Sequence, residues 1–277
     1  MMNVRWNFDR QTVWCVSLAA RPGIAGYMIF NVAFQHAGLN MAYLPLQITD
    51  EDQLRDAVAG LRGLRIRGCG VSMPHKRAVL PLVDHVDPVA QRIGAANTVV
   101  NDDGVLTAYN TDYLAARGIL AANGVGAGTS VLLLGAGGVA SAIACALCEI
   151  GAQVTVAARS EERGRAFAQR WNARYLPLDG VGDCDAAVLI NATPVGMAPD
   201  TGAMPIPAGD LSRFDIVADL VAKPSETALV RAARSLDKRV IPGDEFALEQ
   251  AMHQYRLYTG REPPAGVMRD AIRRVDG

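Results

Sequence analysis

A glycine-rich turn separates a short apolar stretch from a helix-like stretch in the second half of the chain. Val131 to Leu134 has the composition of a buried strand, Gly135-Ala136-Gly137-Gly138 follows at once, and Val139 to Ile150 is typical of a helix. Such glycines let the backbone turn sharply and leave the amides of the helix N-terminus open to a pyrophosphate. A second strand, Gln153 to Ala157, follows at the spacing of a mononucleotide-binding unit. The pattern predicts a dinucleotide site; the alternative is a turn that only packs the helix on the strand.

The turn lies within a stretch of 31 residues, from 118 to 148, that carries no charge. A hydropathy window would flag its latter half as a membrane span. Six glycines between positions 124 and 138 interrupt it, however. A single spanning helix tolerates such interruptions poorly. We therefore expect no membrane segment.

The composition indicates a soluble globular chain. Its 277 residues, enough for two domains, hold 27 Lys and Arg against 28 Asp and Glu, a net charge of −1. This balance offers no broad attraction to nucleic acid or anionic lipid. The five scattered cysteines suit a reducing cytoplasm, and the segment Met1 to Arg10 lacks the apolar core of a signal peptide. The four histidines are too dispersed for a zinc motif, so we expect no metal.

Short apolar runs alternate with helix-like segments along the chain, which is typical of an α/β fold with parallel strands and crossover helices. The second half predicts a Rossmann-like, doubly wound sheet. The expected strands of the first half include a hairpin around Asp102-Asp103-Gly104, and Pro74 and Pro81 bracket a short expected helix. The expected strands are Thr12 to Leu18, Met41 to Ile48, Ile66 to Met73, Thr98 to Val100, Val105 to Tyr109, Ser130 to Leu134, Gln153 to Ala157, Ala186 to Asn191 and Asp215 to Leu220.

The residues at the end of the second Rossmann strand indicate which cofactor binds. A site for NAD places Asp or Glu there, whereas this chain has Arg159 and Ser160, with Arg163 one helical turn later. A guanidinium attracts the 2′-phosphate that a carboxylate would repel. We therefore expect NADP, with NAD bound more weakly. Glu161 and Glu162 argue the other way, unless they are first-turn helix residues favoured by the helix dipole.

Five short motifs follow one another along the chain, and a later helix joins them. They are Val71 to Lys76, Asn97-Thr98, Asn110 to Asp112, Gly135 to Gly138 and Asn191 to Met197, with Gly243 to Gln250 in the helix. In this combination and order the chain resembles the shikimate dehydrogenase family over nearly its whole length. The resemblance implies a substrate domain at 1–112, an NADP domain at 113–238, and C-terminal helices at 239–277 that pack back on the substrate domain.

The resemblance also implies the reaction. Members of the family oxidise a ring hydroxyl of shikimate to 3-dehydroshikimate with NADP, or run the reverse, in aromatic amino acid biosynthesis. Lys76 matches the family's catalytic lysine and Asp112 its partner aspartate, so the pair would relay the hydroxyl proton. Taken alone, Lys76 is more simply a solvated surface lysine. His75, its neighbour, receives no role.

The residues expected to bind substrate only partly match the family. Asn97, Gln250 and Ser72 match positions that contact ring hydroxyls, and such groups suit a polyol carboxylate. The usual Ser-x-Ser of the first loop is replaced by Ile24 and Gly26, neither of which binds a carboxylate through its side chain. This loop, and the alanine at 222 where the main branch has tyrosine, look like the shikimate dehydrogenase-like branch. The replacement carboxylate donors are expected among Ser17, Arg21 and Tyr27.

The expected cofactor contacts gather after the strands of the second half. The resemblance places Asn191-Ala192-Thr193 and Gly243 beside the nicotinamide; an ordinary turn is the alternative. The full expected set is Gly135, Ala136, Gly137, Gly138, Val139, Ala140, Arg159, Ser160, Arg163, Asn191, Ala192, Thr193, Val195, Met197, Leu220 and Gly243.

Two other functions remain open on the sequence. The altered first loop permits quinate or an aminated analogue of shikimate as the substrate. A nucleotide-sensing protein that keeps the fold without turnover is the second alternative, although Lys76, Asn97 and Asp112 together have no purpose in a sensor. We expect a monomer or a homodimer.

Overall fold

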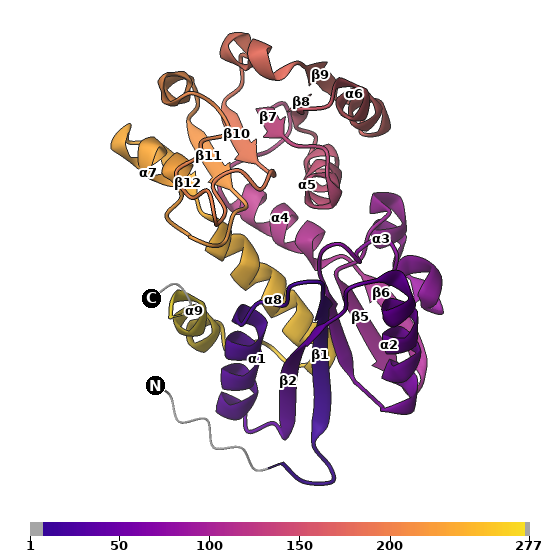
Figure 1. Cartoon of the computed structure of the whole chain (residues 1–277). Coiled ribbons are helices and arrows are strands. Elements are labelled where there is room, and N and C mark those ends of the chain that lie inside the picture. Colours follow the sequence, from indigo (N-terminus) through magenta and orange to yellow (C-terminus); the bar gives the residue numbers. More distant parts are fainter. Residues whose placement is uncertain (1–7, 275–277) are drawn as a thin grey trace. The chain divides into compact units, whose positions relative to one another are not determined.

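The computed structural model describes residues 8–274 and divides into two compact units (Figure 1). Of the described residues, 8–111 and 248–274 form one unit, and Asp112–Ala247 form the other. Most of the segment Met1 to Arg10, for which we expect no signal peptide, lies outside the described residues. Within residues 8–274, no helix has both the length and the apolar character needed to cross a bilayer.

The first unit is built on a six-stranded mixed sheet in the order β2-β1-β3-β5-β6-β4. Its first three strands are parallel, and β5 and β6 form the expected antiparallel hairpin, which turns through Asp103 and Gly104 with positive φ. The parallel strands bury an apolar core that includes Leu18, Leu54 and Leu106. The strands are β1 Val13–Ala19, β2 Met41–Gln47, β3 Gly68–Val71, β4 His85–Val86, β5 Thr98–Asp102 and β6 Val105–Tyr109.

Local capping signals explain where several helices of the first unit begin. The Asp50 carboxylate accepts from Gln53 N at the start of α2, and Asp87 caps α3 ahead of Pro88. The helix expected between Pro74 and Pro81 is instead a run of turns that ends in a short 3₁₀ segment, η1 (Leu80–Leu82). The α-helices that lie wholly in this unit are α1 Ala25–His36, α2 Glu51–Gly63, α3 Pro88–Ile93 and α9 Ala265–Arg273.

Aromatic packing ties the C-terminal segment to the first sheet. Phe30 of α1 stacks on Tyr43 of β2 with ring centroids 4.5 Å apart, and Tyr258 lies 5.8 Å from Phe30. A Cβ at Gly68 would fall 2.2 Å from the Tyr258 ring, so only glycine allows this approach. Figure 1 shows α9 beside α1.

The second unit is a six-stranded, wholly parallel sheet in the order β12-β11-β10-β7-β8-β9. Read from the other edge, this is the doubly wound order of dinucleotide-binding folds, with β7 first along the chain. The expected strands are confirmed, and β9 and β12 are two further strands that the sequence does not predict. The strands are β7 Ser130–Leu134, β8 Gln153–Ala157, β9 Arg174–Leu176, β10 Val188–Asn191, β11 Ile216–Asp219 and β12 Arg239–Ile241.

Helices follow the strands of this sheet in the crossover pattern. Figure 1 shows α5 and α6 beside β7 to β9, and α7 beside β11 and β12. The helix α8 has residues in both units and ends at Thr259. Gly260 then takes a positive φ, and Pro264 precedes α9. The remaining elements are α4 Thr111–Ala122, α5 Gly138–Glu149, α6 Glu161–Arg170, η2 Leu178–Asp183, η3 Ala208–Arg213, α7 Ala228–Ser235 and α8 Gly243–Thr259.

Candidate functional site

The glycine turn after β7 is shaped as an anion site. Gly135 has φ +108°, and a Cβ there would lie 3.0 Å from the carbonyl oxygen of Ala192, so both the conformation and the space require glycine. Gly137 is the N-cap of α5 with no side-chain cap, and a Cβ on Gly137 or Gly138 would meet open space. The N-terminus of α5 therefore has no side-chain cap, and its two glycines leave free space beside it. These features fit a bound pyrophosphate.

Replacing Gly135 tests how much this turn contributes to folding. We expect Gly135→Ala to lower the free energy of unfolding by about 1–3 kcal/mol, because the added methyl meets backbone in a positive-φ position. Gly138→Ala is the matched control: its methyl enters open space within a helix, so the free energy of unfolding should stay equal or rise slightly. Urea unfolding of the two variants measures the difference. Equal losses in both would contradict the geometry.

The residues after β8 present positive charge at the neighbouring strand end. Arg159 and Arg163 are exposed, and the Ser160 hydroxyl caps α6 by accepting from Arg163 N at 3.4 Å. Glu161 is engaged elsewhere, since its carboxylate lies 2.8 Å from Arg165 Nε one helical turn away. Glu161 is thus a first-turn helix residue with its own partner. The strand end fits a phosphate better than a ribose hydroxyl.

A hydrogen-bonded loop follows β10 at the same edge of the sheet. Asn191 is fully buried, and its Oδ1 accepts from Thr193 N at 3.0 Å and from Thr193 Oγ1 at 2.6 Å. Its Nδ2 donates to Val195 O at 3.2 Å. The side chain of Asn191 therefore fixes the path of the loop on which Ala192 and Val195 are half-buried and Met197 is exposed.

Gly243 begins α8 against the loop that follows β11. A Cβ at Gly243 would fall 2.3 Å from Val221 O and 2.7 Å from Ala222 N, an approach that only glycine permits. In the same loop, Leu220 N donates to Asn191 O at 2.9 Å. The expected cofactor residues of the second unit therefore share the carboxyl edge of its sheet, where doubly wound folds bind dinucleotides. Their glycines, open amides and arginines fit NADP.

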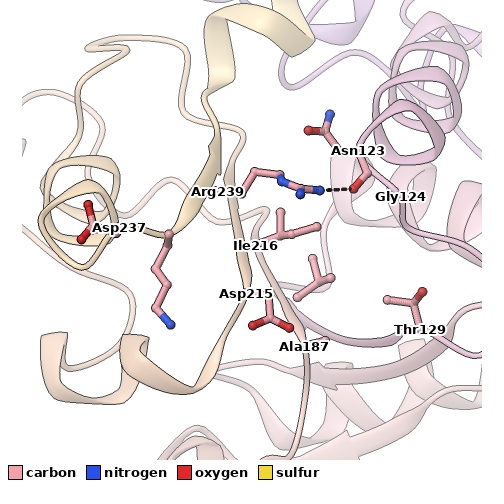
Figure 2. A pocket seen from close by; sticks show the side chains of 10 residues that line it. Asn123, Gly124, Thr129, Ala187, Asp215, Ile216, Asp237 and Arg239 are labelled. Carbon is pink, nitrogen blue, oxygen red and sulfur yellow. Dashed lines mark hydrogen bonds between the residues drawn. The ribbon is translucent and has the colours of Figure 1, made fainter.

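A hollow of about 670 Å³ lies at the opposite, amino-terminal edge of this sheet (Figure 2). It is lined by residues that immediately precede strands, among them Thr129, Ala187 and Asp215. Arg239 crosses it and donates to Asn123 O at 2.9 Å (Figure 2). Ligands of doubly wound sheets bind at the carboxyl ends of the strands, so this hollow is not the candidate site.

Lys76 stands on the loop that leaves β3 in the first unit. Its side chain is half-buried, and its carbonyl oxygen accepts from Ala96 N at 2.8 Å. Val71 N donates to Asn97 O at 2.8 Å, so the loop is joined to the start of β5 on both sides. Ser72, in the same loop, is exposed. Lys76 and Asn97 are therefore held at one edge of the first sheet.

His75 is a residue of this loop to which the sequence assigns no role. It is 2% exposed, and its Nε2 lies 2.8 Å from the carbonyl oxygen of Ile48. Since a carbonyl can only accept, Nε2 carries the hydrogen. The ring anchors the loop next to Lys76, and the sequence could not indicate this because the partner is a backbone group at the end of another strand.

Asn97 is buried, and three donors fix its side-chain amide. Its Oδ1 accepts from Thr111 N at 2.8 Å, Thr111 Oγ1 at 3.1 Å and Thr98 Oγ1 at 2.9 Å. These three donors show which atom of the amide is the oxygen. The Nδ2 atom, which can only donate, points away from them. Asp112 directly follows Thr111 and lies in the first turn of α4, where its charge suits the helix dipole.

Gln254 of α8 donates hydrogen bonds to Asn97 and to its neighbour Thr98, and it is not among the residues predicted from the sequence. It is 3% exposed, and its Nε2 donates to Thr98 Oγ1 at 2.9 Å and to Asn97 O at 3.2 Å. Gln250, the expected substrate contact, is half-buried one helical turn earlier on the same face. The i, i+4 repeat of glutamines is a sequence signal by which Gln254 could have been found.

Ser17 lies next to this network, whereas the other two expected carboxylate donors lie in the first loop. Burial raises the pKa of the Tyr43 phenol, and the neighbouring Ser17 hydroxyl opposes the shift. A Cβ at Gly70 would fall 2.6 Å from the Tyr43 hydroxyl and 3.7 Å from Gln254 Nε2. Arg21 is exposed, and Tyr27 is half-buried in the first turn of α1.

Comparison with known proteins decides the family. Three sequence profiles match the chain: "Shikimate dehydrogenase substrate binding domain" at 26–99, "Shikimate / quinate 5-dehydrogenase" at 120–195 and "Shikimate 5'-dehydrogenase C-terminal domain" at 245–273. A shikimate dehydrogenase (NADP(+)) of Methanothermobacter thermautotrophicus is 38% identical over 258 residues, 90% of this chain and 91% of the relative. The chain belongs to the shikimate dehydrogenase family.

Two further relatives refine the placement within the family. A shikimate dehydrogenase-like protein of Haemophilus influenzae is 32% identical over 266 residues, 95% of this chain and 96% of the relative. The crystal structure of the shikimate 5-dehydrogenase of Thermus thermophilus in complex with NADP(H) and shikimate has a TM-score of 0.86 and 32% identity, and covers 95% of this chain and 99% of that one. The expected family, its shikimate dehydrogenase-like branch and the fold are confirmed.

The side chains that usually bind metal ions do not cluster in the described part of the chain. Among residues 8–274, no three His, Cys, Asp or Glu side chains gather where they could hold an ion. The cysteines are free thiols. Cys145 and Cys148 have Cys-x-x-Cys spacing on α5, and Cys148 Sγ donates to Trp171 O at 3.2 Å.

Proposed function

We propose that this chain is an NADP-dependent alcohol dehydrogenase that interconverts shikimate and 3-dehydroshikimate. The observation that carries the proposal is the frame at the edge of the first sheet, where the carbonyl of Lys76 is bonded to Ala96 N and three donors orient the neighbouring Asn97 amide. A lysine and an oriented amide donor suit a hydroxyl that must be held and deprotonated. Relatives named shikimate dehydrogenase (NADP(+)) support the same reaction.

Each unit contributes one part of the reaction. The first unit, with Lys76, Asn97, Ser72 and Gln250, binds the ring hydroxyls. The second unit, with its glycine turn and Arg159, binds NADP, which when bound supplies the hydride acceptor. This assignment follows the carboxyl-edge rule for doubly wound sheets and the match of residues 26–99 to a substrate-binding profile.

The oxidation releases a proton from the hydroxyl, and the chain must accept it. In the proposal, Lys76 accepts this proton as a neutral amine, and in the reverse direction it donates the proton as an ammonium. Asp112 accepts a hydrogen bond from the substrate hydroxyl and holds the lysine amine in place. A carboxylate partner near a lysine also stabilises the charged form that results.

The carboxylate of the substrate needs a cationic or hydroxyl partner in the first loop. Ile24, 56% exposed at the start of α1, and Gly26 offer none. We infer that Arg21 binds the carboxylate, with Ser17 and Tyr27 as hydroxyl donors, since an exposed guanidinium forms bidentate pairs with carboxylates. A quinate or an aminated ring would meet the same loop and is the second candidate substrate.

A substrate panel tests the proposed reaction. Shikimate, quinate and an aminated shikimate are each offered with NADP and with NAD, and the reduced cofactor is followed by its absorbance. We expect shikimate with NADP to give the highest kcat/KM. A chain that binds NADP but oxidises none of the panel would favour the sensor alternative.

The setting of the enzyme is a further part of the proposal. Its five thiols suit the reducing cytoplasm. We infer that it works there as a monomer or homodimer, and light scattering of the purified chain distinguishes the two.

A further inference from the structure

Asp219 is a fully buried carboxylate at the carboxyl end of β11, and the reaction proposed above does not use it. Its Oδ1 accepts from Asn191 Nδ2 at 2.9 Å and from Val221 N at 3.1 Å, and its Oδ2 accepts from Thr227 Oγ1 at 2.6 Å. Burial raises the pKa of Asp219, and the three hydrogen bonds oppose that shift. With a donor at each contact, the group fits this place as a carboxylate with both oxygens accepting.

The three donors belong to three separate segments of the second unit. Asn191 ends β10 and shapes the loop to Val195, and Val221 belongs to the loop after β11. Thr227 is the N-cap of α7, where its hydroxyl accepts from Val230 N at 3.1 Å. One carboxylate therefore fixes two loops and the start of a helix at one edge of the sheet.

The contacts of these segments extend to the glycines of the cofactor site. Ala192, next to Asn191, has the carbonyl that a Cβ at Gly135 would approach to 3.0 Å. Val221 has the carbonyl that excludes a Cβ at Gly243. The arrangement around Asp219 thus sets the surfaces against which both glycines pack.

The strand order indicates which end of a dinucleotide lies here. The phosphate turn follows β7, and Arg159 follows β8 on one side of it. An NADP whose 2′-phosphate meets Arg159 therefore directs its nicotinamide to the other side, over β10 and β11. Asp219 lies at the end of β11, beneath this second half of the site.

We propose that Asp219 is a positioning residue that shapes the nicotinamide end of the NADP site by holding the loops after β10 and β11 and the start of α7 together. The inference rests on the proposed function, since it requires NADP to bind across this sheet edge. It assigns the residue no contact with the reacting atoms.

Two ligands separate positioning from general destabilisation. NADP occupies both halves of the site, whereas adenosine 2′,5′-bisphosphate has only the half that meets the turn at Gly135 and Arg159. In Asp219→Asn an amide NH₂ replaces one accepting oxygen, so one side of the cluster loses its acceptor. We expect the Kd of NADP to rise by about tenfold, the scale of losing a hydrogen bond to a charged group, while the Kd of the bisphosphate is unchanged. The ratio of NADP to NAD affinity should also stay constant.

Variants at Thr227 keep the test independent of whether Asp219→Asn folds. Thr227→Val removes the hydroxyl that donates to Asp219 and should weaken NADP binding in the same selective way. Thr227→Ser retains the hydroxyl and should restore the affinity. Asp215→Asn is the matched control, because this exposed aspartate lies at the opposite end of the same strand.

Each outcome has one reading. Selective loss of NADP affinity in Asp219→Asn or Thr227→Val, with Thr227→Ser and Asp215→Asn like the wild type, supports the inference. Equal loss of both ligands, or no loss, overturns it while the proposed function stands. A wild-type chain that binds neither ligand overturns the proposed function and the inference with it.

Discussion

We expect the Lys76→Ala variant to lose turnover while it keeps its affinity for NADP. We expect kcat for shikimate oxidation to fall by at least about a hundredfold, the lower range for removal of a positioned general base. The cofactor site of the second unit lacks Lys76, so the Kd of NADP, measured by quenching of protein fluorescence, should be nearly unchanged. Steady-state kinetics at saturating cofactor give the first quantity.

Arg77→Ala is the matched control for this prediction. Arg77 is the next residue and is exposed, so its removal takes away the same charge from the same turn. We expect its kcat to equal that of the wild type. If Lys76→Ala oxidised shikimate at the wild-type rate, the proposed role of Lys76 as the proton acceptor would be wrong.

The second large effect is expected at the 2′-phosphate. Arg159→Asp should weaken NADP binding by about a hundredfold, because charged hydrogen bonds are lost and a carboxylate then repels the phosphate. Affinity for NAD, which has a hydroxyl there, should not fall and the preference should reverse. Titration of each cofactor into the variant measures both constants.

Arg213→Asp makes the same change of charge at a distant place in the second unit. Arg213 ends η3, before the amino end of β11, and its Nη2 lies 3.5 Å from Asp210. We expect its cofactor affinities to match the wild type. Unchanged NADP affinity in Arg159→Asp would refute our interpretation of the strand end. An equal loss of affinity in both variants would show that the effect comes from the net charge and not from a contact with the 2′-phosphate.

Much of the fold could be predicted because its signals are local. The turn at Gly135 follows an apolar run of strand length, and Asp50 and Asp87 cap helices at the positions where such residues are favoured. The strands β9 and β12 were not predicted, because three residues leave no room for a periodic pattern. Between Pro74 and Pro81 the prolines indicated a helix, but the chain forms turns.

The site was harder to predict where a residue acts through a distant partner. Arg159 could be singled out from its residue type at the end of a strand, and Lys76 and Asn97 from the resemblance to the family. His75 and Asp219 could not, because their roles depend on burial against Ile48 O and Thr227. Sequence spacing does not give such partners, and a buried polar group is informative only once its hydrogen bonds are known.

Transfer of deuterium tests the central claim most directly. Shikimate with deuterium on the carbon whose hydroxyl is oxidised is incubated with the wild-type chain and NADP, and the reduced cofactor is analysed by mass spectrometry. The proposed hydride transfer predicts deuterium in the nicotinamide ring, in step with formation of 3-dehydroshikimate. Binding of NADP without any reduced, deuterated cofactor would contradict the account.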